Sequence, residues 1–142
     1  MKELVFGIWI GVQGCIDYKY KEIPLWLSLL GGGVGIIFCV AEERTWISTL
    51  VACVPGILAL VFSFFTHEVM GYGDGIVLVV MGIFMSVSQI ISVGMLAFLL
   101  AGVVALVLLV VYRKRGNYQI PFIPFLAMAY GIEYVCKWGG AL

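Results

Sequence analysis

Long runs without charge are the feature that most constrains how this chain can fold. The longest covers residues 75–112 and carries no charged side chain. As one helix it would span about 57 Å, nearly twice the thickness of about 30 Å of a bilayer's hydrocarbon core. We therefore expect two helices here, with a turn within residues 86–92, where serines and a glutamine gather.

Four further apolar runs precede and follow this stretch, each bordered by charged or polar residues: 4–16, 23–41, 45–66 and 121–132. Hydrophobic residues make up 63% of the chain and charged residues 11%, whereas soluble domains have about 45–50% and about 25%. This composition excludes a soluble globule and a disordered chain. It predicts an all-α polytopic membrane protein with about six transmembrane helices, forming one domain over residues 1–142.

The charges between these runs suggest an orientation. The loops after the first, third and fifth spans hold five basic residues, against three on the other side. The excess of Lys and Arg predicts that these loops are cytoplasmic and that both termini lie outside. The five residues are Lys19, Lys21, Arg113, Lys114 and Arg115.

The same counts exclude some functions. The formal net charge is zero, which argues against binding to nucleic acid through phosphate contacts. The four cysteines are scattered and form no CxxC pair, so we expect apolar core cysteines, with no metal and no cofactor.

Two aspartates stand out at the ends of apolar runs. Asp17 follows the first run, and Asp74 precedes residues 75–112. Two runs long enough to cross the bilayer separate them, so both carboxylates should lie on the same side at similar depth. Glycines at Gly71, Gly73 and Gly75 surround Asp74 and allow backbone to approach the carboxylate closely. We expect an active-site loop there, with room for an extended substrate strand.

Two carboxylates that share a site cannot easily both ionise, so one stays protonated. The ionised group can take a proton from water while the protonated one polarises a peptide carbonyl. The sequence contains no HExxH, GxSxG or P-loop motif. It therefore favours general acid–base hydrolysis by Asp17 and Asp74 without a covalent intermediate.

Other interpretations of the same residues stay open. Acids at the membrane edge are often idle solvated charges, or they pair with nearby lysines. An acid pair within the membrane also suits a proton- or ion-coupled transporter, although we find no internal repeat. A membrane scaffold without catalytic activity is the third alternative.

Three sequence elements occur together: Asp17 followed by a basic stretch and Ile23-Pro24, Gly-x-Gly-Asp at residues 71–74, and Pro-Phe-x-Pro-Phe-Leu at residues 121–126. In these elements the chain resembles the type IV prepilin peptidases, a group of GxGD-type membrane aspartyl proteases. The family often has Asn where this chain has Leu25, and Lys where it has Ile76. Neither difference touches the two aspartates.

The resemblance implies cleavage of a short basic leader from prepilins or pilin-like proteins, on the cytoplasmic face of the prokaryotic plasma membrane. Lys19, Lys21 and Glu68 are then candidate contacts to the leader, while the lysines also suit topology and anionic lipid. Only sixteen residues precede Asp17 and paired cysteines are absent. We therefore expect a short form without the zinc loop and methylation region of larger members.

Overall fold

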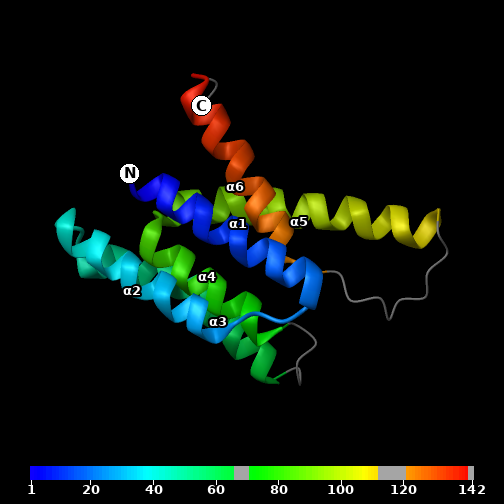
Figure 1. The fold of residues 1–142 in the computed structure, drawn as a ribbon, viewed down its shortest axis with the longest axis horizontal. Coiled ribbons are helices and arrows are strands. Elements are labelled where there is room, and N and C mark those ends of the chain that lie inside the picture. Colours follow the sequence, from blue (N-terminus) through cyan, green and yellow to red (C-terminus); the bar gives the residue numbers. More distant parts are fainter. Residues whose placement is uncertain (66–70, 112–120, 141–142) are drawn as a thin grey trace.

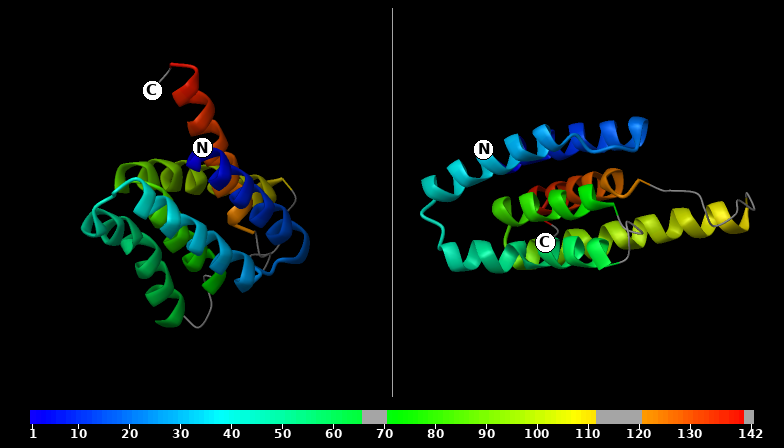
Figure 2. Two further views of the ribbon diagram at one scale, coloured as in Figure 1. Left: turned by 60° about the vertical axis from the view of Figure 1, so that its left-hand side comes forward. Right: turned by 90° about the horizontal axis from the view of Figure 1, so that it is seen from below.

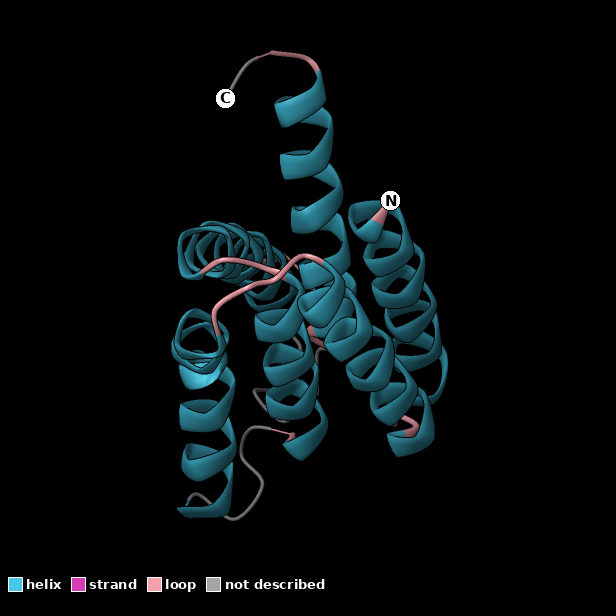
Figure 3. Cartoon of the chain, turned by 90° about the vertical axis from the view of Figure 1, so that its left-hand side faces the viewer, coloured by secondary structure: helices cyan, strands magenta, loops and turns pink. Residues whose placement is uncertain are grey.

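The computed structural model describes residues 1–65, 71–111 and 121–140. Within these ranges the chain is helical apart from short connections, and it contains no strand (Figure 3). The six described helices are α1 (Lys2–Tyr20), α2 (Leu25–Ala41), α3 (Trp46–Phe65), α4 (Tyr72–Phe84), α5 (Val87–Val110) and α6 (Ile123–Trp138). The all-α prediction is confirmed.

Membrane-crossing capacity is clear for two of the described helices. By length and apolar composition, α3 and α5 can cross a bilayer. The apolar helices α2 and α4 are shorter, and α1 and α6 carry charges near their ends. The structure therefore supports two membrane-capable helices, where the sequence predicted about six.

The long uncharged stretch is divided into two helices, as expected. Helix α4 ends at Phe84 and α5 begins at Val87. The turn is therefore formed by Met85 and Ser86, at the start of the expected range 86–92. Ser86 Oγ accepts a hydrogen bond from Gln89 N, and Gln89 Oε1 accepts one from Ser86 N. This capping box satisfies backbone donors at the start of α5.

The helices stack in pairs. Seen from below, α1 and α2 form one layer, α4 and α6 lie in the middle, and α3 and α5 form the layer beyond (Figure 2). Helix α5 extends past the rest of the bundle (Figure 1). An ion pair of 2.6 Å between Lys137 Nζ and Glu3 Oε1 joins the start of α1 to the end of α6.

Helices α3 and α4 approach each other closely because small residues line their contact. A Cβ atom at Gly82 would lie 2.6 Å from the Ala52 carbonyl oxygen, and one at Gly75 would lie 2.7 Å from Leu60 Cγ. Side chains at these positions would push the two backbones apart. The glycines therefore fix the position of α4, which carries Asp74.

Arg44, in the α2–α3 connection, secures the other end of α4. Its guanidinium donates to the Ile83 and Met85 carbonyl oxygens. The last carbonyls of a helix have no partner within the helix, so Arg44 acts as a cap where the chain turns from α4 into α5.

Candidate active site

Asp17 lies in the last turn of α1 and is 6% exposed. Its Oδ2 accepts a hydrogen bond of 3.3 Å from the backbone N–H of Ile123, the first residue of α6. We expected Asp17 to close the first apolar run, but α1 continues through it to Tyr20. The carboxylate is therefore held on a rigid helix and faces the N-terminus of another.

Asp74 lies in the first turn of α4 and is partly buried. Gly71 is the N-cap residue of this helix, and its carbonyl oxygen accepts a hydrogen bond of 3.1 Å from Asp74 N. A carboxylate in the first turn of a helix interacts favourably with the helix dipole.

The two aspartates lie at the same end of the bundle because α1 and α4 run antiparallel. Phe6, near the start of α1, and Phe84, at the end of α4, have ring centroids 5.1 Å apart. From this contact, the rise along α1 to Asp17 is about 16 Å and the rise back along α4 to Asp74 is about 15 Å. The two aspartates therefore lie at similar heights along the helices.

Electrostatics links the two carboxyl groups, which lie outside the membrane-capable helices α3 and α5. Burial raises the pKa of Asp74 to about 7, and the charge of Asp17 adds to this increase. Burial also raises the pKa of Asp17, while the Ile123 N–H opposes the change. Burial thus keeps Asp74 protonated up to about pH 7, while the hydrogen bond from the Ile123 N–H favours the ionised form of Asp17.

The glycines around Asp74 do not form the open loop that we expected. Gly73 and Gly75 are already helical in α4. A Cβ atom at Gly73 would lie 2.8 Å from Ile23 Cβ. Gly75 is similarly close to Leu60 on α3. Gly73 thus makes room for the α1–α2 connection, and Gly75 lets α3 approach. Their place beside the substrate stays a prediction.

The candidate leader contacts have different surroundings. Lys19 is exposed, and its ammonium lies 5.2 Å from the centre of the Tyr20 ring. Lys21 ends α1 in the left-handed conformation (φ 53°), and its N–H donates to the Asp17 carbonyl oxygen. Both lysines are thus at the aspartate end of α1. Glu68 lies outside the described residues, so its predicted contact stays untested.

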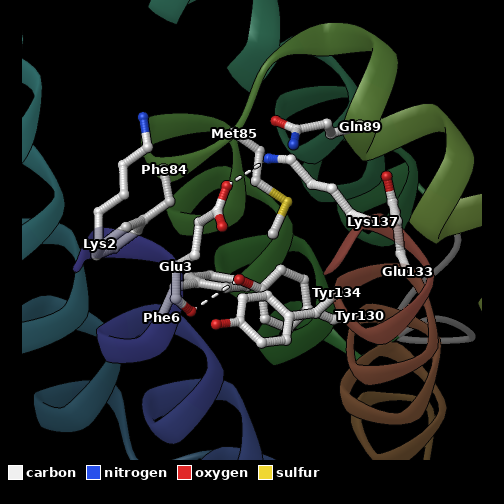
Figure 4. A pocket seen from close by; sticks show the side chains of 10 residues that line it. All are labelled: Lys2, Glu3, Phe6, Phe84, Met85, Gln89, Tyr130, Glu133, Tyr134 and Lys137. Carbon is white, nitrogen blue, oxygen red and sulfur yellow. Dashed lines mark hydrogen bonds and ion pairs between the residues drawn. The ribbon is translucent and has the colours of Figure 1, made fainter. Parts of the chain in front are cut away.

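A separate pocket lies at the opposite end of the bundle, between the start of α1 and the end of α6 (Figure 4). Tyr130 donates a hydrogen bond of 2.8 Å to the Glu3 carbonyl oxygen there. This pocket contains neither aspartate. Among the described residues, no three His, Cys, Asp or Glu side chains gather to hold a metal ion.

Sequence reasoning missed two groups near the aspartates. One is the Ile123 N–H, because every residue except proline carries such a donor and only the fold brings it to Asp17. The other is Gln13, which is fully buried one turn before Asp17. Its place in an apolar run was the available signal.

The fold and site thus define a helical protein with two membrane-capable helices and a coupled pair of carboxyl groups at one end. The family model of the type IV leader peptidase family matches residues 4–110, which include Asp17 and Asp74. The chain belongs to this family of membrane-associated peptidases, which confirms the resemblance. No curated protein and no solved structure matches it.

Proposed function

We propose that the chain is an aspartyl endopeptidase that removes the leader peptide of type IV prepilins or pilin-like proteins. The observation that supports this proposal is the position of Asp17 and Asp74 at one end of antiparallel helices, where the charge of Asp17 raises the pKa of Asp74. Membership of the leader peptidase family supports a protein substrate.

The surroundings of the two carboxyl groups suggest separate roles. Asp17 accepts a hydrogen bond from the Ile123 N–H at the start of α6, and this hydrogen bond favours its ionised form. Asp17 is therefore the general base and takes a proton from the attacking water. Asp74, whose pKa is about 7, is the general acid and donates its proton to the substrate.

The bonds change in two steps. The water oxygen bonds to the peptide carbonyl carbon while Asp17 receives the proton and Asp74 protonates the carbonyl oxygen. The C–N bond of the tetrahedral intermediate then breaks, and Asp17 gives its proton to the leaving nitrogen. At the same time the hydroxyl group that becomes the carbonyl oxygen returns its proton to Asp74. The products are a leader carboxyl group and a new amino terminus, with no covalent enzyme intermediate.

A multi-pass arrangement in the prokaryotic plasma membrane suits the exposed surface. Large apolar side chains face outward from several helices, including Ile8 on α1, Leu29 on α2 and Leu106 on α5. Lipid is the natural environment for such a surface. Lys19 and Lys21 favour a cytoplasmic position for the aspartate end, where the polar leader would reach the acid pair.

Co-expression with a tagged prepilin tests the proposal. The wild-type chain should convert the substrate to the shorter mature form on a gel, and Asp17→Asn and Asp74→Asn should each abolish conversion at unchanged expression. Glu3→Gln is the matched control, because it neutralises an acid at the opposite end of the bundle and should leave cleavage intact. Processing by both aspartate variants would refute the acid-pair mechanism.

A further inference from the structure

Gln13 is an unusual residue in the interior of this bundle. It is fully buried on α1, and its Nε2 donates a hydrogen bond of 2.9 Å to Ser28 Oγ on α2. Its Oε1 is also buried and has no hydrogen-bond partner in the described part of the chain. A buried acceptor left unpaired loses the hydrogen bonds that it makes with water in the unfolded chain. Gln13 therefore lowers stability unless its oxygen binds something.

Gln13 shares one face of α1 with Asp17. The buried positions of α1 include Phe6, Ile10, Gln13 and Asp17, which recur at helical spacing. Residues four apart on a helix lie one turn apart and differ by about 40° around its axis. The amide and the carboxylate are therefore neighbours on the same face.

The layer around Gln13 is otherwise mostly apolar. Gln13 lies seven residues after Phe6 on α1, and Val77 lies seven residues before Phe84 on α4. Because the two helices are antiparallel and touch at Phe6 and Phe84, Gln13 and Val77 lie at the same height, one turn from Asp74. Val77 is fully buried. Ser28 Oγ already accepts a hydrogen bond from the amide nitrogen of Gln13. The next polar side chains along α1 and α4 are Asp17 and Asp74.

We propose that Gln13 is a further residue of the peptidase site, whose Oε1 accepts a hydrogen bond from the water molecule that Asp17 deprotonates. This inference rests on the proposed function. The water gives one proton to Asp17 and directs its other O–H to Gln13 Oε1, which leaves an oxygen lone pair directed at the peptide carbonyl carbon. Ser28 fixes the amide so that its acceptor, and not its donor, serves the water.

The test replaces Gln13 by Met, which has a similar size but no comparable acceptor. Cleavage of a purified prepilin by the reconstituted full chain should lose about tenfold or more in kcat, while KM changes little because the water does not bind the substrate's leader. Because the variant also loses the hydrogen bond to Ser28 Oγ, kcat is compared at a temperature below the melting transition of both proteins. This separates a role in the reaction from a role in folding.

Two further variants sharpen the result. Gln13→Glu keeps an acceptor oxygen and should retain more activity than Gln13→Met, with the acidic limb of the pH profile moved to higher pH by the added carboxyl group. Thr49→Val is the matched control, because it removes a buried hydroxyl that contacts Cys39 Sγ near the opposite end. It should keep the wild-type kcat.

The outcomes separate this inference from the proposed function. Wild-type kcat in Gln13→Met, together with inactive Asp17→Asn, would overturn the role of Gln13 and leave the acid pair standing. Equal losses in Gln13→Met and Gln13→Glu, with an unchanged pH profile, would also overturn it. Failure of the wild-type chain to cleave the prepilin would refute both.

Discussion

The pH dependence of cleavage is the prediction that follows most directly from the paired carboxyl groups. Burial and the charge of Asp17 raise the pKa of Asp74 to about 7. If protonated Asp74 is the general acid, kcat/KM should fall above this pH. One essential proton lost lowers the rate tenfold for each pH unit, so the rate at pH 9 should be about a hundredfold below its maximum.

The acidic limb reports the other carboxyl group. Asp17 must be ionised to act as base, and burial raises its pKa above the ordinary value of 3.8. The rate should therefore decline already above pH 4 as the solution is acidified. The two limbs together give a bell-shaped profile whose apparent pKa values belong to the pair.

The assay is cleavage of a purified prepilin by the protein in lipid vesicles, with initial rates measured from pH 4 to pH 9. Unchanged tryptophan fluorescence over this range serves as the control for folding. A substrate without titratable side chains beside the cut excludes effects of substrate ionisation. A rate that stays level or rises between pH 7 and pH 9 would refute the assignment of Asp74 as the acid.

Three structural predictions accompany this profile. Ile123→Pro removes the N–H that donates a hydrogen bond to Asp17, at a first helical position that suits proline. The acidic limb of the rate profile should therefore move to higher pH. Ile123→Val, the control, should not move it. Gly73→Ala adds a methyl group against Ile23, which should destabilise the fold by about 1–3 kcal/mol and reduce cleavage. If the double variant Gly73→Ala/Ile23→Ala does not recover cleavage, this explanation is wrong. Asp74→Asn should stabilise the protein at pH 8 relative to wild type but not at pH 4, because the unfolded chain releases the Asp74 proton near pH 4 and the folded chain only near pH 7. Wild-type stability therefore falls across this interval by at most about 4 kcal/mol, less any solvent screening, and equal melting temperatures of the two proteins at both pH values would refute the raised pKa.

Much of the helical fold could be predicted from the sequence because the positions of apolar runs and charges are local signals. The uncharged stretch of residues 75–112 predicted two helices, and the structure places the turn at Met85 and Ser86. The two runs between Asp17 and Asp74 argued for a common side, and both residues lie at one end of the bundle. The number of clear membrane spans could not be predicted in this way, since α2 and α4 are short and α1 and α6 carry charges near their ends.

The finer parts of the site depend on contacts that no local pattern encodes. The Ile23–Gly73 contact joins the Ile-Pro and Gly-x-Gly-Asp elements, which lie about fifty residues apart in the chain. It shows that Gly73 is small because Ile23, in the α1–α2 connection, packs against α4. The expected loop was wrong at Gly73 and Gly75 because glycine near a helix start is also compatible with helix when a neighbour packs against it.

The titration of Asp74 tests most directly whether the two aspartates form one unit. Infrared difference spectroscopy of the reconstituted protein can follow the protonated carboxyl group of Asp74 with pH, with Asp74→Asn identifying its band. In wild type the midpoint should lie near pH 7, and in Asp17→Asn it should move lower while staying above 3.8, because burial persists. An unchanged midpoint in Asp17→Asn would contradict the account.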